Sequence, residues 1–230
     1  MSRPPASKGD RHEQPVTITG DSVSLEGMLG VPPHAPGVIL FAHGSGSSRL
    51  SPRNNYVARV LRDAGLATLL MDLLTEEEDR DYETRFDIDL LTRRLVAASR
   101  WIGKQPQSRG LAIGYFGAST GAAAALNAAA RLGGAVGAVV SRGGRPDLAD
   151  ALDRVQAPTL LIVGGLDTEV IALNRQAYAQ LRGEKELTIV PGATHLFEEP
   201  GTLEQVAELA ARWFTRHLAP LTRMENTHAP

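Results

Sequence analysis

The chain has 230 residues, of which 43% are hydrophobic and 22% charged, enough for one large domain with a sizeable buried core. A net charge of −2 gives no reason to expect a nucleic acid or an anionic membrane surface as a partner. The sequence contains no cysteine, which excludes disulfides, thiolate nucleophiles and cysteine-ligated metal sites.

The two ends of the chain differ in character from its middle. Residues 1–14 and 219–230 are polar, contain proline and show no periodicity, so we expect loose tails around a single domain at 15–218. The first tail lacks the apolar core of a signal peptide, and no apolar run approaches the roughly 20 residues that span a bilayer. These features predict a cytoplasmic protein with no membrane partner.

The chain begins with an antiparallel hairpin and then alternates between strand and helix. Strand-like runs at 16–19 and 22–31 flank Gly20-Asp21, which is typical of a hairpin turn. The patterns that follow predict six strands, at 38–42, 67–72, 111–116, 136–140, 159–163 and 187–190. Helices are predicted between and after them, at 54–64, 86–104, 120–132, 169–181 and 202–217. Because these strands are continuously apolar, they indicate an α/β fold with a doubly wound, mostly parallel sheet buried on both faces.

No large cap domain is expected over this sheet. The interval 141–157 is too short to form one, although a short helix near 148–152, capped by Asp147, fits within it. The one candidate lid is the loop 73–85, which carries the acidic run 76–79. A solvated surface loop explains this charge more simply than a gate over a substrate, and the question stays open here.

Gly117-Ala118-Ser119-Thr120-Gly121 is the strongest candidate for chemistry. This G-x-S-x-G frame lies between a buried strand and a helix of small residues. A serine at such a sharp turn presents its hydroxyl outside the sheet, and glycines permit the close backbone approach that the turn requires. Ser119 is therefore a candidate nucleophile, although a glycine-rich turn alone would also explain the pattern.

A serine nucleophile needs a base, and the base needs a carboxylate that orients it. His195 follows the last predicted strand, at the sheet edge that also carries Ser119, whereas His217 lies within a helix. Asp167 follows the strand at 159–163 and is the expected orienting acid, with capping of the next helix as its alternative role. Asp147 is the less favoured rival acid.

Backbone amides near the nucleophile are needed to stabilise an oxyanion. We expect them from Thr120, directly after the nucleophile, and from Ser45 in the loop His43-Gly44-Ser45-Gly46. His43 is expected to hold that loop in shape. A phosphate cradle in the same loop is disfavoured, because a lone G-x-G is weak evidence and the Walker lysine is missing.

Together these motifs make the chain resemble an α/β-hydrolase over residues 15–218. It shares HG-x-G, G-x-S-x-G, an Asp loop and a His loop in the order Ser, Asp, His, and its cap-free size is most similar to dienelactone-hydrolase-like proteins. The resemblance implies the triad Ser119, Asp167 and His195. Dienelactone hydrolases proper use a cysteine nucleophile, so Ser119 at that position supports a general serine hydrolase rather than that particular substrate.

The sequence thus predicts a serine esterase that cleaves a small carboxylic ester, lactone or thioester through an acyl-enzyme, without metal or organic cofactor. Acyl transfer or peracid formation by the same triad, or ligand binding without turnover, remain alternatives. Arg142 and Arg145 are candidates for clamping a substrate carboxylate, unless they pair with Asp147 or Asp72. Leu166 and Leu196 are candidates for lining an acyl pocket. The oligomeric state is not predicted.

Overall fold

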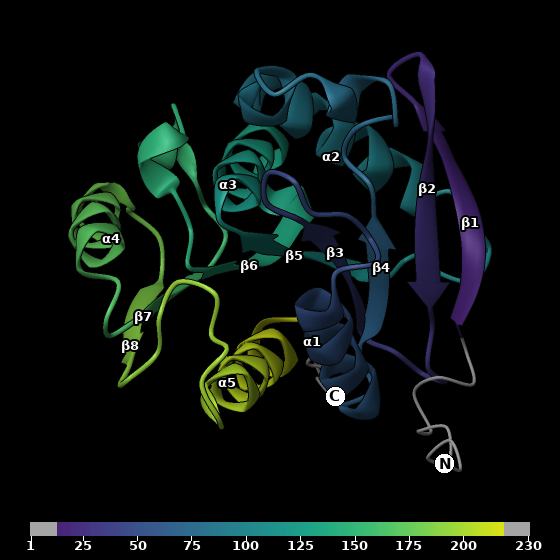
Figure 1. Ribbon diagram of the computed structural model, residues 1–230. Coiled ribbons are helices and arrows are strands. Elements are labelled where there is room, and N and C mark those ends of the chain that lie inside the picture. The colour runs from purple at the N-terminus through teal and green to yellow at the C-terminus, as the bar shows by residue number, and fades with distance from the viewer. Residues whose placement is uncertain (1–12, 219–230) are drawn as a thin grey trace, which may run out of the picture.

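A computed structural model describes residues 13–218. Apart from residues 13 and 14, the predicted tails at 1–14 and 219–230 lie outside the described residues. One sheet of eight strands runs through it in the order β1-β2-β4-β3-β5-β6-β7-β8 (Figure 1). The strands are β1 (Glu13–Gly20), β2 (Val23–Gly30), β3 (Gly37–Ala42), β4 (Ala67–Met71), β5 (Ala112–Ala118), β6 (Val136–Arg142), β7 (Thr159–Gly164) and β8 (Lys185–Val190). The β1–β2 and β2–β4 pairs are antiparallel and every later pair is parallel, which confirms the predicted fold class.

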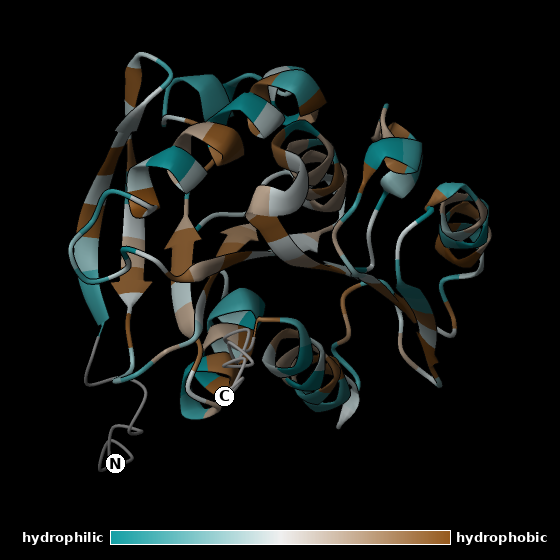
Figure 2. Cartoon of the chain, turned by 180° about the vertical axis from the view of Figure 1, so that it is seen from behind, coloured by the Kyte–Doolittle hydropathy of each residue, from teal (hydrophilic) through white to brown (hydrophobic). Residues whose placement is uncertain are grey.

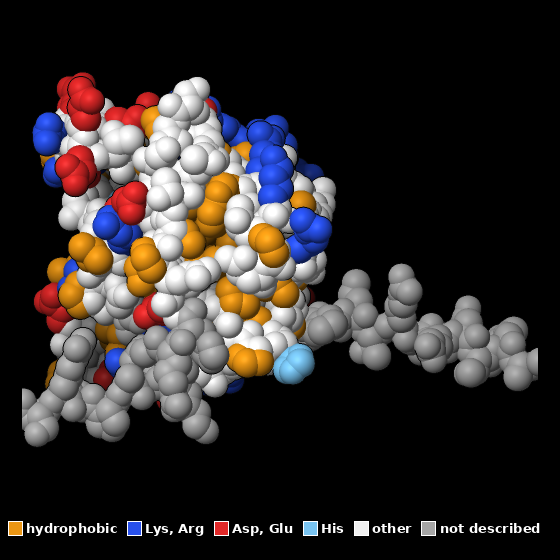
Figure 3. All heavy atoms as spheres, turned by 90° about the vertical axis from the view of Figure 1, so that its right-hand side faces the viewer, with side chains coloured by type: hydrophobic (Ala, Val, Ile, Leu, Met, Phe, Trp, Pro, Cys, Tyr) orange, Lys and Arg blue, Asp and Glu red, His pale blue; other side chains and the backbone are white. Residues whose placement is uncertain are grey.

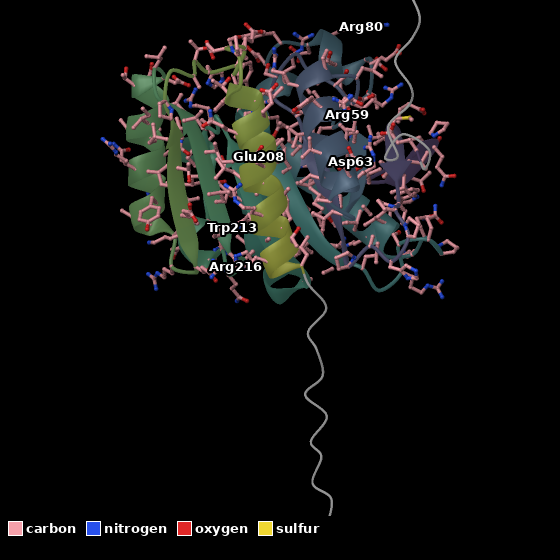
Figure 4. All side chains as sticks on the ribbon, turned by 90° about the horizontal axis from the view of Figure 1, so that it is seen from below. Arg59, Asp63, Arg80, Glu208, Trp213 and Arg216 are labelled. Atoms are coloured by element: carbon pink, nitrogen blue, oxygen red, sulfur yellow. The ribbon has the colours of Figure 1, made fainter. Side chains whose placement is uncertain are left out.

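Helices cover both faces of the sheet. The helices α1 (Pro52–Asp63) and α5 (Thr202–His217) lie on one face, and α2 (Ile88–Ile102), α3 (Thr120–Leu132) and α4 (Thr168–Gln180) lie on the other (Figure 1). Figure 4 views the first face and shows α5, which carries Glu208, Trp213 and Arg216, beside α1, which carries Arg59 and Asp63. Trp213 is buried against the sheet, whereas Glu208 and Arg216 are exposed, as an amphipathic helix requires.

The sheet separates two apolar cores. On the side of α2 and α3, side chains such as Leu95 and Leu126 pack onto Leu40 and Leu69. On the side of α1 and α5, Leu61 and Phe214 pack onto the opposite face of the same strands. Figure 2 shows the consequence, with hydrophobic residues along the strands and polar residues on the outer surfaces of the helices. Burial on both faces explains why these strands are continuously apolar.

Several boundaries differ from the predicted ones for local reasons. The first strand begins at Glu13, before the predicted domain start at 15, because its pairing with β2 extends to that residue. The helix predicted from 54 begins at Pro52, since the Ser51 hydroxyl caps it and proline suits the first turn. The helix predicted at 86–104 is shorter, because Asp87 caps it at Ile88 and its last helical residue is Ile102.

The short helix predicted near 148–152 is wrong. The structure instead has two single turns, η5 (Pro146–Leu148) and η6 (Leu152–Arg154), and Asp147 lies inside the first of them and caps nothing. Proline at the start and extended backbone at Ala149 limit η5 to one turn. Within residues 13–218 this interval forms no cap domain over the sheet.

The acidic loop after β4 is anchored to the molecule. It contains the single turns η2 (Glu78–Arg80) and η3 (Thr84–Phe86). Glu78 pairs with the buried Arg94 of α2 at 2.6 Å, and Asp79 pairs with Arg85 at 3.1 Å. These ion pairs tie the loop to α2 and to itself, and a gate over a substrate stays the less favoured alternative to a surface loop.

Charged side chains of both signs lie on the side of the molecule formed by β1 and β2 (Figure 3). Lys and Arg side chains form a group at the upper right of this view, and acidic side chains at the left have further Lys and Arg side chains among them. Among the described residues, no helix has the length and apolar character needed to cross a membrane.

Candidate active site

Ser119 occupies a strained turn between β5 and α3, with φ of 50° and ψ of −123°. A non-glycine residue at positive φ persists only where its surroundings enforce it, and such strain is concentrated at functional sites. Ser119 stands at the N-cap position of α3, but its side chain makes no capping hydrogen bond. Its hydroxyl is therefore not used to stabilise the helix.

The glycines of this turn are required by close backbone contacts. A Cβ on Gly121 would lie 2.1 Å from the carbonyl oxygen of Ala42, and one on Gly117 would lie 2.5 Å from the Cα of Ala122. A Cβ on Gly44, in the loop after β3, would lie 2.9 Å from the Cβ of Ser119. The three positions bring the strand, the helix and the neighbouring loop together around Ser119.

His195 and Asp167 form a direct side-chain pair. The Nδ1 of His195 lies 2.7 Å from Oδ2 of Asp167, and the two side chains are 37% and 16% exposed. A carboxylate accepts, so Nδ1 carries the proton and Nε2 of a neutral ring is left as the basic nitrogen. Asp167 stands at the N-cap position of α4 without capping it, so its carboxylate serves the histidine and not the helix.

The loop after β6 contacts both Ser119 and His195. The Ser119 amide donates to the carbonyl of Arg142 at 3.3 Å, and the Arg145 amide donates to the carbonyl of Ser119 at 3.0 Å. Between them, a Cβ placed on Gly143 would lie 3.5 Å from Nδ1 and Cε1 of His195. The nucleophile candidate and the base candidate therefore flank the same short loop.

The two backbone amides expected to bind an oxyanion differ in their hydrogen bonding. The Thr120 amide, at the start of α3, donates to no acceptor within residues 13–218, as is usual for the first turn of a helix. The Ser45 amide donates to Oγ1 of Thr120 at 3.0 Å. The structure thus brings Ser45 and Thr120 together, and the Ser45 amide must exchange this acceptor if it is to bind an oxyanion.

His43 is a buried link between two loops. Its Nδ1 lies 3.0 Å from the carbonyl oxygen of Gly44, and its Nε2 accepts a hydrogen bond from the Leu73 amide at 3.1 Å. Burial lowers the pKa of His43 below its ordinary value, which favours this neutral ring. These contacts match the expected role of shaping the loop and leave His43 away from proton transfer.

The two candidate clamp arginines are not arranged alike. Arg145 makes a two-pronged ion pair with Asp147, at 2.9 and 2.7 Å, which also shows that the rival acid is engaged elsewhere than with His195. Arg142 is only 6% exposed and donates to Oδ1 of Asn54 at 3.3 Å. Each guanidinium is thus engaged by another side chain, and a clamp on a substrate carboxylate stays a prediction.

Apolar and polar surfaces border the site. Leu166 and Leu196 are 63% and 40% exposed, beside Asp167 and His195 respectively, so neither is a core residue. A cavity of about 210 Å³ lies between the loops after β3 and β4. Asp72, Glu76 and Asp79 are among its lining residues, so it offers carboxylates next to the loop of Ser45. No cluster of three or more His, Cys, Asp or Glu side chains within residues 13–218 is placed to hold a metal ion.

Two features of the site were missed by the sequence reasoning. One is the bond from the Ser45 amide to the side chain of Thr120, and the other is the contact of Arg142 with Asn54 and with the ring of Phe197. Each joins residues more than fifty positions apart, and no local pattern in the sequence signals such a pair.

Comparison with known proteins places this site in a family context. A family model described as the dienelactone hydrolase family matches residues 25–223. The crystal structure of a dienelactone hydrolase from Anabaena variabilis ATCC 29413 is 58% identical, with a TM-score of 0.87 over 89% of this chain and 97% of that one. XC6422 from Xanthomonas campestris, described as an α/β serine hydrolase without lid, is 23% identical with a TM-score of 0.73, over 92% of this chain and 97% of its own, and supports the fold alone.

A curated relative is considerably longer than the chain. The Mycobacterium tuberculosis (strain ATCC 25618 / H37Rv) protein called "Putative phosphoribosyl transferase Rv0571c" is 58% identical over 207 residues, which are 90% of this chain and 47% of the relative. The chain thus spans about half the length of the curated relatives it matches. The name describes a protein of which more than half has no counterpart in the alignment.

Proposed function

We propose that this chain, which belongs to the dienelactone hydrolase family and has the α/β-hydrolase fold, is a hydrolase that cleaves carboxylic esters through Ser119, His195 and Asp167. The observation that carries the proposal is the 2.7 Å contact between Asp167 and His195, made by a carboxylate that would otherwise cap α4. An aspartate held in this way fixes the tautomer of the histidine and stabilises its protonated form.

In the proposed reaction, Oγ of Ser119 attacks the ester carbonyl carbon while Nε2 of His195 takes the hydroxyl proton. The tetrahedral intermediate collapses, the alcohol leaves with that proton, and an acyl-serine remains. Water, deprotonated by the same nitrogen, then releases the carboxylic acid and restores Ser119. Lactones and thioesters pass through the same sequence, with the leaving group as a tethered alcohol or a thiol.

The negative oxygen of the intermediate is stabilised in this proposal by the amides of Thr120 and Ser45. The Thr120 amide is supported by its position at the start of α3, where the helix dipole also favours negative charge. For Ser45, the 3.0 Å bond to Thr120 Oγ1 holds the amide beside the nucleophile turn until the oxyanion replaces that acceptor. Leu166 and Leu196 are proposed to contact the organic part of a small-molecule substrate, because both are exposed beside the pair Asp167–His195.

Site-directed variants test the proposal on p-nitrophenyl acetate. Ser119→Ala is expected to lower kcat by on the order of 10⁶, the loss seen where a comparable serine was removed. Asp167→Asn is expected to lower kcat by about 10⁴, because the histidine then takes the wrong tautomer. Circular dichroism and thermal unfolding of each variant establish that it is folded.

Asp147→Asn supplies the matched control for the acid. Asp147 pairs with Arg145 and has no contact with His195, so this variant is expected to keep kcat within about threefold of wild type. A large loss of kcat in Asp147→Asn together with a small loss in Asp167→Asn would show that Asp167 is not the orienting acid. Ester hydrolysis that survives in folded Ser119→Ala would refute the proposed nucleophile.

A further inference from the structure

Arg142 is a buried cation without a carboxylate partner. Three arginines among the described residues are at most 6% exposed, and two of them are paired: Arg62 lies 2.9 Å from Glu13, and Arg94 lies 2.6 Å from Glu78. Within residues 13–218 no acidic side chain pairs with Arg142, and its Nε is buried without a hydrogen-bond acceptor. Burying an unpaired charge costs free energy, so something other than stability explains this residue.

The charge of Arg142 persists at neutral pH. Burial, with the nearby charge of Arg53 as a second cause, lowers the pKa of Arg142 to about 10. The guanidinium therefore remains a cation under the conditions in which an esterase of this kind would work, and its contacts are those of a charged group.

The contacts of Arg142 join the turn that carries Ser119, helix α1 and the loop that carries His195. Its carbonyl oxygen accepts from the amide of Ser119 at 3.3 Å. Its Nη2 donates to Oδ1 of Asn54, a buried residue in the first turn of α1, at 3.3 Å. Its Cζ lies 5.9 Å from the ring centroid of Phe197, within the range of a cation–π interaction.

Phe197 belongs to the loop that carries His195. It is 2% exposed and has φ of 55°, an uncommon conformation for an aromatic residue that its surroundings must enforce. Its amide donates to the carbonyl of Thr194 at 3.3 Å, which closes a turn around His195. The Phe197 ring is therefore anchored two residues beyond His195, at the end of the turn that contains the histidine.

A second contact also joins α1 to the loop that carries His195. Arg53, next to Asn54 in α1, donates to Glu198 at 2.9 Å, but these two side chains are 34% and 61% exposed. An exposed pair of this kind contributes little to stability, which leaves the buried contact of Arg142 with Phe197 as the stronger restraint on the loop.

We propose that Arg142 is a positioning residue that sets His195 against Ser119, by holding the nucleophile turn through its carbonyl and the histidine loop through its guanidinium. The proposal rests on the proposed function, since it assigns Arg142 a role in the same reaction. It replaces the clamp predicted from the sequence, because the guanidinium is packed against Asn54 and Phe197.

Steady-state kinetics of Arg142→Met and Arg142→Lys test this role. Methionine retains apolar volume and removes the charge, and a misplacement of about 1 Å in a catalytic group costs on the order of 10²-fold in rate. Arg142→Met is therefore expected to lower kcat by on the order of 10²-fold with KM nearly unchanged, for neutral and anionic esters alike. Arg142→Lys keeps a cation over the ring and is expected to recover part of that loss.

The control is Arg59→Met. Arg59, which Figure 4 labels on α1, also lies over an aromatic ring, with its Cζ 5.2 Å from the centroid of Tyr56. Within residues 13–218 it has no hydrogen bond or ion pair with the histidine loop. This variant is expected to keep the wild-type kcat. Reactive serine is titrated with a fluorophosphonate in every sample, so that kcat is expressed per competent site. Labelling of wild-type Ser119 comes first, which separates failure of the proposed function from failure of this role.

Two results would overturn the positioning role. A rise in KM confined to anionic esters would show that Arg142 binds substrate. An unchanged kcat per titrated site, with only a lower Tm, would show that it merely stabilises the fold. Where Arg142→Met does not fold, Phe197→Leu removes the ring instead and is expected to lower kcat selectively, whereas wild-type kcat in that variant would also contradict the role.

Discussion

At the scale of single residues, the site is distinguished by two polar side chains that stand at helix N-cap positions but do not cap the helix. Ser119 and Asp167 both stand at N-cap positions, where serine and aspartate ordinarily accept a backbone hydrogen bond. Neither does so here, and the carboxylate of Asp167 is directed to His195 instead. The sequence predicts that both residues lie at strand-to-helix turns, but not where their side chains point. A serine or aspartate at such a turn is equally suited to cap the helix and to take part in catalysis, so the residue type does not decide between the two.

A glycine pair tests the packing around Ser119. Gly121→Ala would place its Cβ 2.1 Å from the carbonyl oxygen of Ala42 and 2.4 Å from that of His43, and backbone atoms cannot yield. The free energy of unfolding is expected to fall by about 3 kcal/mol or more, measured by urea denaturation. Gly134→Ala is the control, since no atom lies within 4 Å of its Cβ position. Equal stability of the two variants would contradict the close approach.

At the scale of elements, loops at the carboxyl ends of the strands hold one another in place. His43 joins the loop after β3 to the loop after β4 through the Gly44 carbonyl and the Leu73 amide. Arg142 joins the end of β6 to α1 and to the loop after β8. The order of strands and helices followed from the apolar periodicity, whereas these cross-links did not, because each joins residues distant in sequence by a side chain whose direction no pattern reveals.

The neutral ring of His43 makes stability depend on pH in a defined direction. Its folded-state pKa lies below the ordinary 6.5, so the unfolded chain binds the proton more readily. The stabilisation that the neutral His43 ring contributes is therefore fully present above pH 6.5 and is lost as the pH falls below that value. The free energy of unfolding is measured for the wild type and for His43→Asn at several pH values. The excess stability of the wild type is expected to shrink as the pH is lowered from about 8 to about 5. His217, whose pKa is also lowered by burial, is present in both proteins and cancels. A difference independent of pH would contradict this assignment.

At the scale of the whole molecule, the large hydrophobic side chains left in solvent gather at one edge. In the described part of the chain they are Leu50, Tyr82, Phe86, Leu166 and Leu196. They follow β3, β4, β7 and β8, and the parallel strands end at the same edge, on either side of β5 and its Ser119. Under the proposed function, we expect this apolar rim to favour neutral esters with apolar groups.

Leu196→Ser tests whether this rim binds substrate. A buried methylene contributes about 0.8 kcal/mol, or roughly fourfold in kcat/KM. The variant is expected to lose more kcat/KM on p-nitrophenyl butyrate than on the acetate, since the longer chain has more area to bury. Acetate hydrolysis serves as the internal control for an intact triad. Equal losses on both esters would show that Leu196 does not contact the acyl chain.

Ser119 is proposed to be an activated nucleophile, and covalent labelling is the shortest test of this role. The folded protein is incubated with a fluorophosphonate, and the adduct is located by peptide mapping. We expect a single adduct on the peptide that contains Ser119, no adduct in folded Ser119→Ala, and a much slower reaction in Asp167→Asn. Failure of the folded wild-type protein to react, or an adduct on another residue, would contradict it.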